Sequence, residues 1–298
     1  MSDITILGIF VADISFSGDK IPIEGETILG DSYNVGPGGK GCNQAIAISR
    51  LGGKVNFISK IGNDEYGKLA INNFKKDNID ISNIIISKKH KTGVAGIHID
   101  RNTGKNAITV VRGAPASLTR EEIDTNKIKQ SKIFLTQLEV PLDVTLHCLK
   151  AAKENGLINI LNPAPACKLS NEFFKLVDYF TPNETEAEYY TGIKIINETD
   201  AKKSALKLIK MGIKNVIITL GEKGLFFSNG IENIYIKSIQ VKAIDTTGAG
   251  DAFNGGFTLA LLKGKKIKEC LEFANRVAGL STTKLGAGDS MPTLNELN

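Results

Sequence analysis

The sequence predicts an α/β fold in which a mostly parallel central sheet is flanked by helices and accompanied by a small β-sheet. Short apolar runs, typical of buried parallel strands, alternate with helical patterns along most of the 298 residues. Two stretches, residues 14–37 and 92–114, instead alternate polar and apolar residues and contain several glycines, as exposed antiparallel strands do. No repeat, low-complexity tract or linker divides the chain, so we expect a single domain over residues 1–298.

The strands of the central sheet are expected where apolar runs end in turn residues, at 4–10, 54–62, 132–140, 158–166, 178–183 and 215–224. Helical patterns separate them at 40–52, 143–154 and 200–211, the first ending at a glycine. Residues 92–114 predict a hairpin with its turn at 101–104. The alternating segment 239–244 predicts a strand that leads into a helix near residue 249.

The composition argues against several classes of protein. The formal net charge is only +5, and the one dense basic run, residues 88–91, indicates a solvated loop rather than a nucleic-acid patch. The four cysteines form no C-x-x-C pair and the three histidines are scattered, so neither a zinc site nor a disulfide scaffold is expected. We find no signal-peptide pattern and no run of roughly 20 apolar residues, and therefore expect a cytoplasmic protein.

Polar residues follow the predicted strands at the edge where α/β sheets bind ligands. Each of them is also an ordinary turn residue, but together they outline a site. They are Asp13, Glu139, Asn162, Asn183, Gly221 and Asp245.

The segment DTTGAGDAFNGGF, residues 245–257, combines a glycine turn with two aspartates at a helix start. A glycine-rich turn there leaves backbone N–H groups free to bind a phosphate, and Asp251 in the first helical turn could accept a proton from an attacking hydroxyl. The alternative is a common aspartate N-cap. That alternative does not explain Gly255 and Gly256 inside the helix, where each costs about 1 kcal/mol relative to alanine, so we favour a functional interpretation.

The segment GPGGKGCNQA, residues 36–45, also brings glycines to the start of a helix. It is a weak match to the dinucleotide fingerprint, and Lys40 is followed by glycine rather than by the Ser or Thr of a Walker A loop. The backbone of Gly38–Gly41 could instead approach a polyhydroxylated ligand, with Asn43 adding a hydrogen-bonding amide. A flexible hinge is the alternative, and both roles are compatible.

The segment TPNETEAEYY, residues 181–190, places Asn183 and Glu186 three residues apart at a helix start. This spacing is that of a capping box, with Asn183 as N-cap. Residues alone give no further role.

These three motifs together resemble the ribokinase (pfkB) family of ATP-dependent carbohydrate kinases. The segments LNPAPA, ITLGEKG and GAGDSMP follow in the family's order, so the resemblance runs from Ile6 to about Pro292. It implies the family's α/β fold, with residues 14–37 and 92–114 as a β-sheet lid that often doubles as a dimer interface. The segments GVAGIHI and AITVV supply an apolar face of that lid, and a homodimer is therefore expected.

The resemblance also implies roles for the residues that match family motifs. Asp251 is similar to the catalytic base, and the backbone of Gly248, Ala249 and Gly250 to the anion hole. The sugar-binding positions are Asp13, Gly39, Lys40, Gly41, Cys42, Asn43 and Glu139, with Val11 where the family often has asparagine. A second departure is Gly113-Ala114-Pro115, where the family reads GAN.

Nucleotide and metal positions follow in the same way. The nucleotide-contact positions are Asn183, Thr219, Leu220, Gly221, Glu222, Lys223, Gly224, Gly250 and Asn275. Glu186 matches a residue associated with Mg²⁺ and phosphate. The positions of a monovalent-cation (K⁺) site are Asp245, Thr247, Ser281, Lys284, Gly286 and Ser290.

The implied activity is transfer of the γ-phosphoryl group of ATP to the 5-hydroxyl of D-ribose, giving ribose 5-phosphate. Alternatives are the same chemistry on deoxyribose, fructose, a keto-deoxy sugar acid or a nucleoside, or a non-catalytic sugar-sensing module. An intact Asp251 and glycine turn argue against the last of these.

Overall fold

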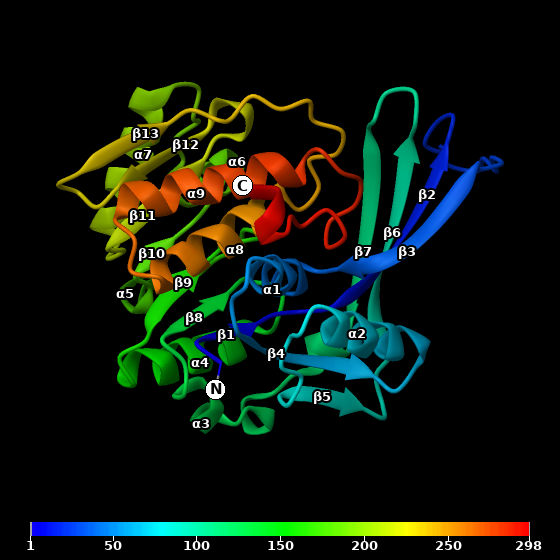
Figure 1. Ribbon diagram of the computed structural model, residues 1–298, viewed down its shortest axis with the longest axis horizontal. Helices are drawn as coiled ribbons and strands as arrows, with labels where there is room; N and C mark the ends of the chain where they lie inside the picture. Colours follow the sequence, from blue (N-terminus) through cyan, green and yellow to red (C-terminus); the bar gives the residue numbers. More distant parts are fainter. Residues whose placement is uncertain (1, 298) are drawn as a thin grey trace.

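The structure is a computed structural model that describes residues 2–297 and contains two β-sheets (Figure 1). The large sheet has the strand order β13-β12-β11-β10-β9-β8-β1-β4-β5. Its strands are β1 (Ile4–Leu7), β4 (Val55–Gly62), β5 (Ile84–Ser87), β8 (Ile133–Thr136), β9 (Ile158–Leu161), β10 (Tyr179–Phe180), β11 (Asn215–Thr219), β12 (Leu225–Ser228) and β13 (Asn233–Ile236). All neighbours pair in parallel except β11–β12 and β12–β13, so the predicted mostly parallel sheet is confirmed.

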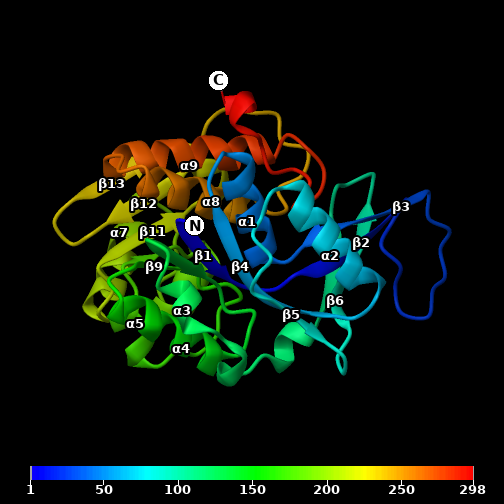
Figure 2. The same ribbon diagram turned by 60° about the horizontal axis from the view of Figure 1, so that its bottom comes forward.

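Helices cover both faces of the large sheet (Figure 2). The helices are α1 (Lys40–Arg50), α2 (Glu65–Lys76), α3 (Thr125–Ile128), α4 (Leu142–Glu154), α5 (Asn171–Leu176), α6 (Glu184–Thr191), α7 (Glu198–Lys210), α8 (Ala249–Leu262) and α9 (Ile267–Ser281), with 3-10 turns at Ala114–Ser117, Arg120–Glu122, Gly221–Lys223 and Leu294–Leu297. One core joins the sheet to α1, α2, α8 and α9, and the other joins it to α3–α7. Successive strand residues alternate between the two cores, as with Ile133 and Phe134, which is why these strands are apolar throughout.

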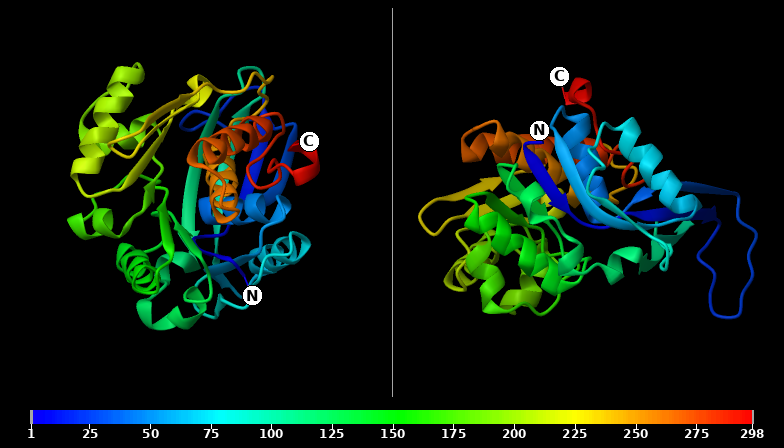
Figure 3. Two further views of the ribbon diagram at one scale, coloured as in Figure 1. Left: turned by 60° about the vertical axis from the view of Figure 1, so that its left-hand side comes forward. Right: turned by 90° about the horizontal axis from the view of Figure 1, so that it is seen from below.

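The small sheet lies beside the large one and has the strand order β3-β2-β6-β7 (Figure 1). Its strands are β2 (Val11–Gly18), β3 (Ser32–Gly38), β6 (Thr92–Asp100) and β7 (Asn106–Gly113). The expected hairpin is β6–β7, and β2–β3 is also antiparallel, whereas β2 and β6 pair in parallel with Val11 opposite Gly93. The loop between β2 and β3 projects away from the body (Figure 3).

The apolar residues of the small sheet lie on both of its faces, not on the single face that we expected. Ile108 pairs with Ile97 and Val110 with Ala95, which itself pairs with Asp13, so these side chains share the face of Asp13. Phe16 pairs with His98 and Tyr33 on the opposite face. Half or more of Tyr33 and Val110 is exposed, at 73% and 50%.

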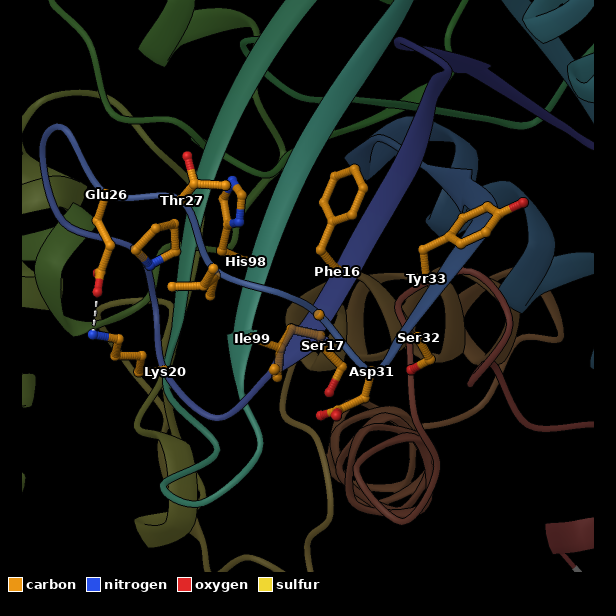
Figure 4. A pocket seen from close by; sticks show the side chains of 14 residues that line it. Phe16, Ser17, Lys20, Glu26, Thr27, Asp31, Ser32, Tyr33, His98 and Ile99 are labelled. Carbon is orange, nitrogen blue, oxygen red and sulfur yellow. Dashed lines mark hydrogen bonds and ion pairs between the residues drawn. The ribbon is translucent and has the colours of Figure 1, made fainter.

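A hollow of about 500 Å³ lies between the small sheet and the β2–β3 loop (Figure 4). Phe16 stacks on His98 on its floor, with ring centroids 5.6 Å apart, and Lys20 pairs with Glu26 at its rim. None of the predicted site residues lines it. This concavity therefore belongs to the small sheet rather than to the chemistry expected at Asp251.

One predicted element is wrong. The segment 239–244 is not a strand, because β13 ends at Ile236 and the chain has no regular structure from there to Gly248. Of its apolar residues, Ile239 packs over Gly279 of α9, whereas Val241 and Ile244 are exposed. Within residues 2–297, no helix has both the length and the apolar character needed to cross a membrane.

Candidate active site

Asp251 lies in the first turn of α8, which is the place that the sequence predicts. Gly248 precedes the helix with φ of 78°, a conformation that glycine adopts without steric cost. A Cβ atom at Gly250 would meet nothing within 4 Å, so the space in front of this turn is open. The free N–H groups and the helix dipole at such an N-terminus favour an anion.

The carboxylate of Asp251 is buried and held by two amides from α1. Asn43 Nδ2 donates to Oδ2 at 2.9 Å, and Gln44 Nε2 donates to Oδ1 at 3.0 Å. Burial raises the pKa of Asp251, while the Lys40 ammonium and these two hydrogen bonds oppose the rise. A buried carboxyl group with two amide donors therefore lies in the first turn of a helix whose N-terminus is open.

Other predicted sugar-site residues converge on the same place. The backbone N–H of Lys40 donates to Glu139 Oε2 at 2.9 Å, which joins the start of α1 to the loop after β8. Burial raises the pKa of Glu139 to about 7. Burial, followed by the charges of Asp251 and Asp289, raises the pKa of Asp13 to about 7. The Asp251 carboxylate raises the pKa of Lys40 against the effect of its burial.

The glycines between β3 and α1 allow this convergence. A Cβ atom at Gly38 would overlap with the Asp13 carboxylate, and Gly39 has φ of 92° with its Cα facing the carbonyl oxygen of Ile9. The sequence therefore needs glycine at both positions for the chain to turn into α1 beside Asp13.

Two predicted sugar-site side chains face apolar surroundings. Cys42 is fully buried among core residues, so its backbone is the part that borders the site. Val11 is 2% exposed and packs in the core that contains Ile9 and Ala95, on the same strand face as Asp13.

The predicted nucleotide residues form a second group along the strand ends. Asn183 and Glu186 make the expected capping box, with reciprocal bonds of 2.8 and 2.9 Å, and Asn183 bridges to Thr219 at the end of β11. Burial raises the pKa of Glu186. Asn275 and Gly224 both contact the segment after β13. Asn275 Nδ2 donates to the carbonyl oxygen of Lys237 at 2.8 Å, and Gly224 packs closely against the backbone of the same residue.

The predicted cation residues bring the loop before α8 against the loop after α9. Asp245 Oδ1 accepts bonds from Thr247 N at 2.9 Å and from Thr247 Oγ1 at 2.7 Å, and its Oδ2 accepts from Gly286 N at 2.9 Å. The Ser290 hydroxyl donates to the carbonyl of Ala287, and the Lys284 ammonium pairs with Glu296. Ser281 ends α9 one residue before Thr282, whose carbonyl accepts from the backbone of Asp245 at 3.1 Å. In the described part of the chain, no three His, Cys, Asp or Glu side chains are grouped to hold a metal by themselves.

Two helix glycines are structural, which corrects the functional interpretation given to them above. A Cβ atom at Gly255 would lie 2.6 Å from the Cβ of Ala47 in α1. One at Gly256 would lie 3.0 Å from Val277 in α9. These glycines let α8 pack closely against both neighbours, and they say nothing about catalysis.

Sequence reasoning missed the buried amides behind Asp251. Gln44 and Gln137 are 0% and 1% exposed, and they contact each other as well as the strand ends. A signal was present, because each is a polar residue directly next to apolar residues, Ala45 to Ile48 after Gln44 and Leu138 after Gln137. Their partners lie far away in the chain, so the pattern alone does not reveal what they bind.

Comparisons with known proteins identify the family of this chain. The model of the pfkB family carbohydrate kinases matches residues 1–294. A ribokinase of Haemophilus influenzae is 43% identical over 98% of this chain and 96% of its own. Solved structures of ribokinases from Thermotoga maritima (38% identity, TM-score 0.91) and from Arabidopsis thaliana with ribose and ATP (30% identity, TM-score 0.93) each superpose over 100% of this chain and 98% of theirs. The chain therefore belongs to the pfkB family of carbohydrate kinases.

Proposed function

We propose that this protein transfers the γ-phosphoryl group of ATP to the 5-hydroxyl of D-ribose, giving ribose 5-phosphate and ADP. The observation that carries the proposal is the buried carboxylate of Asp251, held by two amides beside the open N-terminus of α8. Full-length similarity to proteins named ribokinase supports ribose as the sugar.

In the proposed reaction, Asp251 accepts the proton of the 5-hydroxyl as its oxygen bonds to the γ-phosphorus. The bond from the γ-phosphorus to the β–γ bridging oxygen breaks, and ADP leaves with that electron pair. The backbone N–H groups of Gly248–Gly250 stabilise the negative charge of the group in transfer. Asp13, Asn43 and Glu139 orient the sugar, and the Lys40 ammonium adds positive charge next to Asp251.

We assign the nucleotide to the strand ends that carry Asn183, Thr219–Gly224 and Asn275. Mg²⁺ would neutralise the phosphates of ATP, and Glu186, whose pKa burial raises, borders that position. The absence of a three-ligand cluster in residues 2–297 fits this ion, because Mg²⁺ is commonly held by one or two carboxylates, substrate phosphates and water. K⁺ would lie between the loops that Asp245 joins to Gly286 and would hold the glycine turn in shape.

We further propose that the small sheet covers the sugar and pairs with a second copy of the chain. Asp13 lies on β2 of this sheet, so the sheet already supplies part of the site. Apolar side chains are exposed on both faces of the small sheet, and its outer strands, β3 and β7, each have a neighbouring strand on one side only. Both features support the binding of a second copy to this sheet.

The test is a measurement of ADP formation with ribose, 2-deoxyribose, fructose, a keto-deoxy sugar acid and a nucleoside, each with Mg²⁺–ATP. The highest kcat/KM should belong to ribose, with ³¹P NMR showing a product phosphorylated at the 5 position. Activity should also rise when K⁺ replaces Na⁺ at constant ionic strength. A higher kcat/KM for another acceptor would support phosphoryl transfer but identify that acceptor, rather than ribose, as the substrate. No turnover of any acceptor would favour a sugar-sensing module.

A further inference from the structure

A buried chain of amides runs from the strand ends to Asp251. Gln44 uses all of its hydrogen-bonding groups except one lone pair: its Nε2 donates to Asp251 Oδ1 at 3.0 Å and to Asn162 Oδ1 at 3.2 Å. Its Oε1 accepts from Gln137 Nε2. The three amides come from α1, from the end of β8 and from the end of β9, and each is less than one-tenth exposed.

The contacts leave one orientation for the Gln44 amide. Asn162 Nδ2 donates to the backbone carbonyl of Thr181 at 3.1 Å, and a carbonyl can only accept. The oxygen of Asn162 therefore faces Gln44, and the NH₂ group of Gln44 must face Asn162 and Asp251. A donor is thus directed at the Asp251 carboxylate.

This donor acts within a mainly acidic environment. The titratable groups that interact with Asp251 come from every element around it, and Lys40 is the positive member of the set. They are Lys40 and Cys42 of α1, Asp13 of β2, Glu139 of the loop after β8, and Glu186 of α6. Without donors on both oxygens, burial would favour the protonated form of Asp251, which cannot accept a proton.

We propose that Gln44 is a positioning residue, which fixes the plane of the Asp251 carboxylate and keeps it ionised through the buried Asn162–Gln44–Gln137 chain. Asn43 donates to the other oxygen of Asp251. It also belongs to the proposed sugar site, where its amide would bind a sugar hydroxyl. Gln44 has no such second task. The inference rests on the proposed role of Asp251 as the base.

The test is the variant Gln44→Met, which keeps the length of the side chain and removes the donor. The acid limb of the kcat–pH profile should move upward by about one pH unit, since hydrogen bonds to a charged group have this scale. The KM for ATP should stay within about two-fold. A second readout without any substrate is ¹³C NMR of protein labelled at the aspartate carboxyl, with the Asp251 signal assigned from Asp251→Asn. Its titration midpoint should move by the same amount.

The matched control is Asn159→Leu. Asn159 is a fully buried amide that donates to the carbonyls of Leu149 and Leu176, away from Asp251. It should lower the melting temperature without moving either pH readout. If Gln44→Met does not fold, Gln44→Glu supplies the test, because an added carboxylate beside Asp251 should move both midpoints further upward. Unchanged midpoints in a folded Gln44 variant would overturn the proposal. If the NMR midpoint moves but the protein phosphorylates no sugar, the positioning role of Gln44 is retained and the proposed function is overturned.

Discussion

At Asp251, burial and hydrogen bonding act in opposite directions on the same carboxylate. Burial favours the neutral acid, whereas Lys40, Asn43 and Gln44 favour the ion. The balance matters because a general base is most effective when its pKa lies near the working pH. Three residues of α1, a helix far from Asp251 in the sequence, therefore act together on the protonation of this one carboxyl group.

Replacing Asp251 by asparagine should remove the base and keep the shape of the site. We expect kcat to fall by at least about 100-fold, which is the usual contribution of a general base. Sugar affinity should change little, because Asp13 and Glu139 remain. Steady-state kinetics and calorimetric titration with ribose measure the two effects, and a kcat near that of the original protein would remove Asp251 from the mechanism.

Asp13 gives the site a pH-dependent cost in stability. Its pKa is about 7 in the folded protein and 3.8 for an aspartate in water, so the folded state binds more protons between these values. Stability should therefore fall as the pH rises from about 4 to 7, and the loss should be complete above pH 7. Asp13→Asn removes this loss and also lessens the repulsion on Glu139.

The measurement is the melting temperature of the sugar-free protein from pH 5 to pH 8. The advantage of Asp13→Asn over the original protein should grow with pH across this window. Glu24→Gln, an exposed carboxyl in the β2–β3 loop, should show no such trend. A difference that stays constant with pH would mean that Asp13 titrates outside the window.

At the scale of elements, α8 carries glycines for two different reasons. Gly250 faces open space at the N-terminus, whereas Gly255 faces Ala47 across the contact with α1. Gly250→Ala should therefore keep or raise the free energy of unfolding, by up to about 1 kcal/mol, and lower kcat by at least about 10-fold because a methyl group enters the anion site. Gly255→Ala should lower the free energy of unfolding by about 1–3 kcal/mol through overpacking.

Urea denaturation and kcat, measured on both variants, separate these effects. Each variant is the control of the other, since both add one methyl group to the same helix. Full activity of Gly250→Ala would place the anion site elsewhere. Unchanged stability of Gly255→Ala would mean that α1 and α8 can move apart at little cost.

The elements themselves were largely predictable, because their signals are local. Apolar runs identified the parallel strands, and the spacing of Asn183 and Glu186 identified a capping box that the structure contains. The failures are non-local. Segment 239–244 alternates like a strand but finds no partner strand, and the pairing of Gln44 with Asn162 joins residues whose separation no periodicity reveals.

Periodicity could not indicate which residues would lie near Asp251, and this information came from the family motifs. Asp13 and Lys40 were assigned by resemblance, and the structure brings both close to Asp251. The shifted pKa values, in contrast, depend on burial and on charges from other elements. These pKa shifts cannot be predicted from the local sequence pattern.

At the scale of the whole molecule, we expect a homodimer through the small sheet. Val110 is half exposed on β7, so Val110→Lys should introduce a charge into the interface and release monomers. The matched control is Ile231→Lys, which changes an aliphatic residue that is 94% exposed between β12 and β13. Sedimentation at micromolar concentration should show dimers for the original protein and for the control. Monomers in all three samples would refute the dimer.

The parallel pairing of β2 with β6 determines when the small sheet can be completed on the ribosome. Val11 and Gly93 are opposite each other, so the β2–β3 hairpin is synthesised well before the strand that pairs with its inner edge. At 5–20 residues per second, the roughly 50 residues between the end of β3 and the start of β6 take about 3 to 10 s to be synthesised. During that time the hairpin presents an unpaired edge together with Phe16 and Tyr33, and we expect this edge to be a site of aggregation or chaperone binding on the nascent chain.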